Sequence, residues 1–99
     1  VLTNMKGLFP EATFYFYRTS NGAEMDFVMI IRNVVFAIEC KTGFSPSLSK
    51  GNYNAIEDIA PTHTFIVSPI EKGWQMKQTI DVVSIDELEE KIKIMVEQL

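Results

Sequence analysis

The sequence predicts one α+β domain built on a mixed β-sheet. Three runs rich in aromatic and β-branched residues are joined by short turns, which is typical of a three-stranded antiparallel meander. A loop, a helix, a fourth strand, a short strand and an amphipathic C-terminal helix follow. The chain has 99 residues, 46% of them hydrophobic and 22% charged, which suits a single small globular core.

The meander is expected to comprise Phe14–Arg18, Glu24–Ile31 and Val34–Lys41. Between the first two strands, Asn21-Gly22 suits the positive φ angles of a tight hairpin turn. Arg32-Asn33 is a weaker turn signal between the second and third strands. These short connections make neighbouring strands antiparallel.

A helix is predicted over Gly51–Ile59, with Ser49 as its N-cap and Pro61 just beyond its end. Its Gly, Asn and Asp residues give it a low intrinsic helix propensity. The run Thr62–Val67 predicts the fourth strand, which Ser68-Pro69 ends. Because a helix separates them, the third and fourth strands are joined by a crossover.

The C-terminal helix follows a short strand expected over Thr79–Val83. Ser84 and Glu87 form a capping box at its start. Apolar residues then recur at helical spacing, with Met95 beside them: Ile85, Leu88, Ile92, Val96 and Leu99. The acidic residues of the first turns suit the positive end of the helix dipole and do not indicate a metal site: Asp86, Glu87, Glu89 and Glu90.

Charge and cysteine content exclude several classes of protein. Nine basic and 13 acidic residues give a net charge of −4. A domain that binds nucleic acid through its own electrostatic field should instead be basic. Any role with nucleic acid must therefore be local, bridged by a metal, or shared with another part of a larger protein. The single Cys40 and single His63 exclude an internal disulfide and a structural zinc site.

We expect residues 1–99 to be part of a longer cytoplasmic protein. No segment has the roughly 20 apolar residues that span a bilayer or the pattern of a signal peptide. The chain begins with Val1 and not methionine, and Leu2–Lys6 resembles the tail of an earlier segment. Residues 1–99 contain no phosphate-binding P-loop. The oligomeric state stays open.

The second and third strands bring charged residues together. With a two-residue loop at Arg32-Asn33, the sequence positions of any two facing residues add up to 65. Asp26 therefore faces Glu39. One face of this hairpin then carries Glu24, Asp26, Val28, Ala37, Glu39 and Lys41. The other is apolar and carries Met25, Phe27, Met29, Ile31, Val34, Phe36, Ile38 and Cys40.

Two carboxylates facing each other at about 5 Å repel by roughly 3 kcal/mol at an effective dielectric of about 20. Three agents could relieve this repulsion: the ammonium of Lys41, a shared proton, or a bound divalent cation. The plain alternative is a solvated face with an ordinary pair between Glu24 and Lys41. A register slip of one residue would place Asp26 and Glu39 on opposite faces.

Asp26 followed by Glu39-Cys40-Lys41 resembles the D…(D/E)-x-K signature of the PD-(D/E)xK nuclease superfamily, which has the restriction-endonuclease-like fold. A longer pattern comprises Phe16–Thr19, Gly22–Val28 and Ile38–Lys41. It resembles the domain of unknown function at the C-terminus of many bacterial and archaeal AAA-type ATPases. The resemblance covers roughly residues 14–70.

This resemblance implies a role for each matching residue. Asp26 and Glu39 would hold Mg²⁺ or Mn²⁺, with the backbone carbonyl of Cys40 as a third ligand. Lys41 would orient or deprotonate the attacking water, or stabilise charge on the phosphate. Glu24 would be an accessory acidic residue.

Members of the superfamily often carry a further acidic residue on a helix before the first strand. Here that helix is expected to be absent or cut short, and Glu11, beside Pro10, is a poor substitute. Arg18 could contact phosphate or pair with an acid at the sheet edge. Two functions therefore follow: a metal-dependent phosphodiesterase acting on DNA or RNA, or a non-catalytic module that regulates the upstream ATPase or binds a partner.

The remaining conspicuous side chains are expected to be structural. The alternation predicts that Cys40 is buried as a small hydrophobic residue and is not a nucleophile. His63 near a strand start is expected to be structural, and Tyr15 and Tyr17 are expected to pack, with base stacking as the alternative. Trp74 is expected in a turn, as a lid on the core.

Overall fold

The structure, a computed structural model that describes residues 2–98, contains three helices and six strands in that part of the chain. The helices span Leu2–Leu8 (α1), Lys50–Ile59 (α2) and Ile85–Glu97 (α3). The strands span Thr13–Arg18 (β1), Glu24–Ile31 (β2), Val34–Cys40 (β3), His63–Val67 (β4), Trp74–Lys77 (β5) and Ile80–Val83 (β6).

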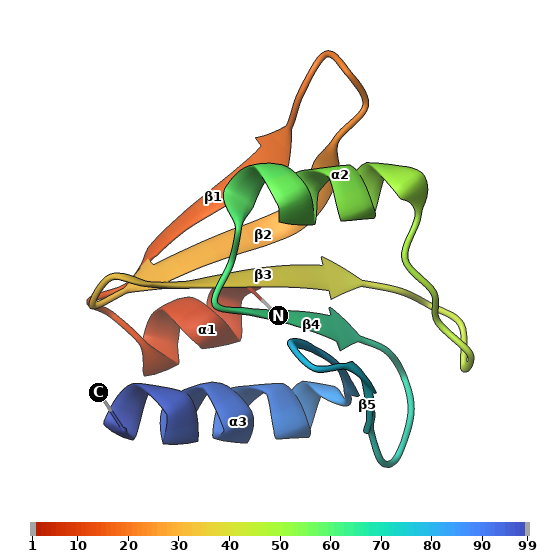
Figure 1. Ribbon diagram of the computed structural model, residues 1–99. Helices are drawn as coiled ribbons and strands as arrows, with labels where there is room; N and C mark the ends of the chain where they lie inside the picture. Colours follow the sequence, from red (N-terminus) through yellow and green to blue (C-terminus); the bar gives the residue numbers. More distant parts are fainter. Residues whose placement is uncertain (1, 99) are drawn as a thin grey trace.

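All six strands form one mixed sheet with the order β1-β2-β3-β4-β6-β5. Strands β1 to β3 form the predicted antiparallel meander, and β3, β4 and β6 run parallel to one another. Helix α2 covers one face of the sheet, and α1 and α3 cover the other (Figure 1). The predicted α+β class is confirmed, and the elements that the sequence predicted occur in the predicted order.

The hairpin of β2 and β3 has the predicted register. Phe27 pairs with Ile38, and Val28 pairs with Ala37, so the sequence positions of each pair add up to 65, as predicted. Arg32 and Asn33 have φ angles of 48° and 69°. Positive φ at both central residues is the geometry of the two-residue turn that matches the twist of paired strands.

One element differs from the sequence prediction, and another agrees with one of its two alternatives. Helix α1 is present but only seven residues long, as expected of a helix that is cut short, and its sequence LTNMKGL contains no acidic residue. Trp74 begins strand β5 and pairs with Val82, so the predicted turn at this position is wrong. Strand β5 is a mostly exposed edge strand with the sequence WQMK, which has no apolar run for a sequence pattern to detect.

The core has a main cluster beneath α1 and α3, a second beneath α2, and a third on the α2 face that contains Ile66, Ile80 and Val82. The main cluster contains Met5, Phe9, Met29, Ile31, Phe36, Ile38, Phe65, Val67, Val83, Leu88, Ile92 and Val96. The second contains Ala23, Met25, Val28, Ala37 and Ala55. Met25 therefore packs against α2, and the prediction that it shares the face of Met29 is wrong.

The amphipathic pattern of α3 is largely confirmed. Leu88, Ile92 and Val96 are buried, and Met95 packs beside them. Ile85 is the exception, because it lies at the first helical position and is 44% exposed. Leu99 lies outside the described residues. Among residues 2–98, no helix is both long and apolar enough to cross a membrane.

The capping box of α3 makes stability depend on the charge of Glu87. Its Oε1 accepts hydrogen bonds from the backbone N–H groups of Ser84 and Gly73, each at 2.9 Å. The hydrogen bond from the Ser84 backbone is the main reason that the pKa of Glu87 lies below the ordinary 4.5. The ionised form therefore stabilises the folded state above pH 4.5, and this contribution is lost as pH falls through the lowered pKa.

We expect Glu87→Gln to lower the free energy of unfolding at pH 7, and the difference from the wild type to shrink in acid. Urea denaturation of both proteins between pH 7 and pH 3 measures this difference. A difference that stays constant across that range would show that the charge of Glu87 is unimportant.

Candidate functional site

A β-bulge in β2 lies at the candidate site. Tyr15 pairs with Val28, but Tyr17 pairs with Met25, so Asp26 and Phe27 together lie opposite the single residue Phe16. The extra residue breaks the alternation of side chains, which explains why Met25 packs on the α2 face. Bulges of this kind redirect side chains and often lie beside functional sites.

The carboxylates of Asp26 and Glu39 link β2 and β3 where the backbone ladder between the strands has ended. The backbone N–H of Asp26 donates to Glu39 Oε1 at 2.9 Å. The backbone N–H of Cys40 donates to Asp26 Oδ2 at 2.8 Å. Each carboxylate thus accepts a hydrogen bond from the opposite strand, and the two acids lie in the same gap between strands.

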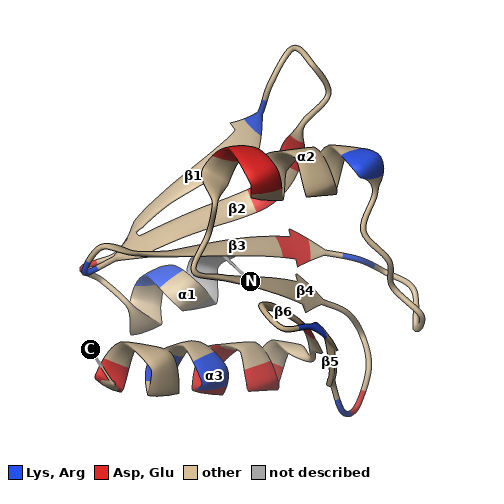
Figure 2. Cartoon of the chain, in the orientation of Figure 1, with Lys and Arg blue, Asp and Glu red and all other residues tan. Residues whose placement is uncertain are grey.

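Lys41 neutralises the more buried of the two acids. Its Nζ lies 3.3 Å from Glu39 Oε2, and the side chains of Lys41 and Glu39 are 26% and 9% exposed. A buried carboxylate needs such partners, because an unpaired charge is strongly destabilising there. Of the three ways to relieve the repulsion between the acids, the structure shows the ammonium of Lys41. Figure 2 shows acidic positions on β2 and at the end of β3, with a basic position just after β3.

Glu24 and Arg18 form a separate pair at the sheet edge. Arg18 Nη2 lies 3.6 Å from Glu24 Oε2, and both side chains are well exposed. The alternative in which Glu24 pairs with Lys41 is therefore wrong. In this structure Glu24 contacts Arg18, while Asp26, Glu39 and Lys41 form the central group.

Cys40 is exposed, so the prediction of a buried cysteine is wrong. It is the last residue of β3, where the strand extends beyond the core. Partial desolvation of the thiol, followed by the negative charges of Asp26 and Glu39, raises the pKa of Cys40. A protonated thiol is a poor nucleophile.

The backbone N–H of Cys40 points toward β2. This N–H donates to Asp26, whereas the next N–H, that of Lys41, donates to Val67 O in β4 at 2.8 Å. In an extended strand the N–H and C=O of one residue point to the same side. The Cys40 carbonyl is therefore expected on the side of Asp26.

Helix α2 holds the start of β2 in place through Asn52, which the sequence analysis did not identify. Asn52 is fully buried, and its Nδ2 donates to the backbone carbonyl of Glu24 at 2.9 Å. The same side chain completes the capping box with Ser49, the predicted N-cap. The sequence did contain a signal for this role, because Asn52 follows Ser49 at the three-residue spacing of a capping box.

A shallow pocket of about 320 Å³ lies beside Lys41. It is lined by Cys40, Lys41, Val67, Ser68, Pro69, Ile70, Ser84, Ile85 and Asp86. These residues lie at the carboxyl ends of β3, β4 and β6 and at the start of α3. Ligands of open α/β sheets bind outside the carboxyl ends of parallel strands. Only the β3 part of this edge was predictable from the sequence.

The donor atoms fit a hard divalent cation. Asp26 and Glu39 supply two carboxylates from adjacent strands, and the Cys40 carbonyl is expected on the same side. Magnesium sites commonly use one or two carboxylates, with water and phosphate oxygens completing the coordination. Within residues 2–98, no group of three or more His, Cys, Asp or Glu side chains could hold a metal ion. The candidate site therefore relies on two acids.

His63 and Tyr17 have structural contacts, whereas Tyr15 is exposed. His63 is buried, and its Nε2 lies 3.0 Å from Asp81 Oδ2, in keeping with a structural role. Tyr17 packs on the α2 face, and its hydroxyl donates to Asp58 Oδ2 at 3.1 Å. Tyr15 is 50% exposed.

Comparison with known proteins identifies a family but no established activity. Residues 3–88 match the family described as Domain of unknown function (DUF4143). The chain is 26% identical over 88 residues to Uncharacterized protein Mb2031c of Mycobacterium bovis and to Uncharacterized protein Rv2008c of Mycobacterium tuberculosis. The matches cover 89% of this chain and 20% of each relative, so the chain spans about one fifth of their length. No solved structure matches. Since the matched region covers most of its residues, the chain belongs to the DUF4143 family.

Proposed function

We propose that this domain is a metal-dependent phosphodiesterase of the PD-(D/E)xK type that acts on nucleic acid. The main support is the arrangement of Asp26 and Glu39, which share the gap between β2 and β3 with Lys41 beside them. The pocket at the carboxyl edge of the sheet adjoins this group and offers space for a substrate.

Each residue has a distinct task in this proposal. Asp26, Glu39 and the Cys40 carbonyl hold Mg²⁺ or Mn²⁺, which when bound lowers the pKa of a water and offsets charge on the phosphate. Lys41 orients the attacking water or stabilises the developing negative charge. One P–O bond forms from the water and another breaks, which leaves a phosphomonoester and a free hydroxyl.

The larger setting is part of the same proposal. The chain spans about one fifth of its relatives, and its motifs resemble the domain that follows AAA-type ATPase modules. We place the domain at the C-terminal end of such an ATPase in the cytoplasm. In that setting, the ATPase region could contribute the basic surface that this acidic chain lacks, which would reconcile a net charge of −4 with nucleic acid as substrate.

Titration of the protein with Mn²⁺ by calorimetry tests the metal site. We expect saturable binding to the wild type and its loss in Asp26→Asn. Asparagine retains a side-chain oxygen that can accept the Cys40 N–H, so the variant removes charge while keeping this link between strands. Glu71→Gln, in the loop between β4 and β5, is the matched control and should bind Mn²⁺ normally.

Cleavage of DNA and RNA then tests the reaction. We expect phosphodiester cleavage that requires Mg²⁺ or Mn²⁺ and disappears in Asp26→Asn and Glu39→Gln. Equal cleavage by the wild type and Asp26→Asn would overturn the proposal. Equal Mn²⁺ binding by these two proteins would remove the proposed metal ligands.

A non-catalytic module of the ATPase is the second candidate. It is favoured by α1, which contains no acidic residue where the superfamily often has one. The same assays separate the two functions. A partner that binds equally to the wild type and to an Asp26→Ala/Glu39→Ala variant, with no metal-dependent cleavage, would support the module.

A further inference from the structure

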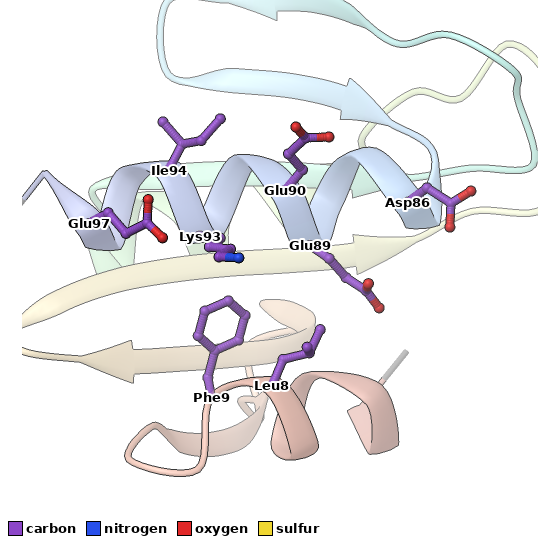
Figure 3. A pocket seen from close by; sticks show the side chains of 8 residues that line it. All are labelled: Leu8, Phe9, Asp86, Glu89, Glu90, Lys93, Ile94 and Glu97. Atoms are coloured by element: carbon purple, nitrogen blue, oxygen red, sulfur yellow. The ribbon is translucent and has the colours of Figure 1, made fainter.

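A second groove, which shares only Asp86 with the pocket beside Lys41, lies between the end of α1 and α3. It is lined by Leu8, Phe9, Asp86, Glu89, Glu90, Lys93, Ile94 and Glu97. Figure 3 shows Leu8 and Phe9 reaching from the end of α1 toward α3, where Glu89 and Lys93 point back toward them.

The groove combines exposed apolar side chains with a mainly negative charge. Leu8 is 54% exposed and Ile94 is 48% exposed, although both are large aliphatic residues. Phe9 continues this apolar surface into the main core. Exposed apolar surface with a polar rim is a common feature of protein interaction sites.

The charges of the lining residues are strongly unbalanced. Four of them are acidic (Asp86, Glu89, Glu90 and Glu97), and among the described residues that line the groove only Lys93 is basic. A complementary ligand must therefore present basic side chains around an apolar centre. An amphipathic helix with lysine or arginine on its polar face combines both features.

We propose that this groove binds a basic amphipathic helix of a partner protein. Apolar side chains of the partner lie on Leu8, Phe9 and Ile94, and its basic side chains pair with the acids on α3. A second copy of this chain fits poorly. In a two-fold dimer the same patch meets itself, so the acidic residues of α3 would face one another.

Fluorescence anisotropy with a labelled synthetic peptide tests this surface. The probe is an amphipathic helix of about 18 residues, or five turns, with leucines on one face and lysines on the other. A peptide with glutamates in place of the lysines is its matched control. We expect the lysine peptide to bind and the glutamate peptide not to bind. We also expect affinity to fall as salt rises, because salt screens exposed charges.

Variants locate the binding surface. Glu89→Gln/Glu90→Gln and, separately, Ile94→Ser should each weaken binding of the lysine peptide by about tenfold, a change of about 1.4 kcal/mol. Glu57→Gln/Glu71→Gln removes the same number of negative charges at exposed positions elsewhere and should bind normally. Circular dichroism checks that each variant is folded.

Three results would overturn the proposal. The first is equal binding of the lysine and glutamate peptides. The second is unchanged affinity in both groove variants. The third is a dimer in sedimentation that Ile94→Ser converts to a monomer, which would make a second copy the occupant. None of these results depends on the metal site, so this proposal and the proposed function can fail separately.

Discussion

Lys41→Met is expected to slow metal-dependent cleavage by about 100-fold or more, while Mn²⁺ binding is retained or strengthened. In the proposed reaction Lys41 acts on the water or the phosphate and is not a metal ligand. Loss of one group that stabilises developing charge commonly reduces the rate by about 10²–10³. Because the ammonium lies 3.3 Å from Glu39 Oε2, its removal also leaves that oxygen free for a cation.

Single-turnover cleavage and calorimetry on the same protein measure the two effects. Lys72→Met, an exposed lysine in the loop between β4 and β5, is the control and should behave as the wild type does. Loss of Mn²⁺ binding in Lys41→Met would contradict the assigned role, since it would show that Lys41 maintains the structure of the site. Undiminished cleavage would also contradict it.

Gly73→Ala is expected to destabilise the fold by about 3 kcal/mol, within the range for overpacking a closely packed site. A Cβ at Gly73 would overlap the backbone carbonyl of Val82 on β6, and backbone cannot move aside as a side chain can. The Gly73 N–H also donates to Glu87, so displacement of this residue weakens the cap of α3. Two elements would therefore be disturbed together.

Urea denaturation of Gly73→Ala and Gly7→Ala provides the comparison. A Cβ at Gly7 would meet nothing within 4 Å, and Gly7 lies in helix α1. Alanine is favoured over glycine inside helices by about 1 kcal/mol, so Gly7→Ala should be neutral or stabilising. Similar effects of the two substitutions would show that the close approach at Gly73 is unimportant.

The local elements of the fold follow directly from the sequence. Strand β2 has the predicted bounds, and the turn at Arg32-Asn33 gives the predicted register with β3. The capping boxes at Ser49 and Ser84 place the starts of α2 and α3. Each of these features depends on residues within a few positions of one another, so the pattern carries the necessary information. Strand β5 was missed because its residues are stabilised by pairing with β6 and not by their own pattern.

The candidate site was only partly predictable. The motif and the register identified Asp26, Glu39 and Lys41, and the structure brings all three together. The bulge at Asp26 was not predictable, because it depends on pairing with β1, whose residues give no local signal of it. The exposure of Cys40 was not predictable either, because it depends on the point at which β3 extends beyond the core.

The α+β class, the order of most elements and the central acidic pair could be predicted from the sequence, because periodicity, turn chemistry and capping act over short distances. The pairing of Lys41 with Glu39 and of Glu24 with Arg18 depends on how the strands pack. The pocket at the carboxyl edge of the sheet and the acidic groove between α1 and α3 depend on tertiary packing in the same way. These features join residues far apart in the chain, and their contacts form only when the strands and helices pack.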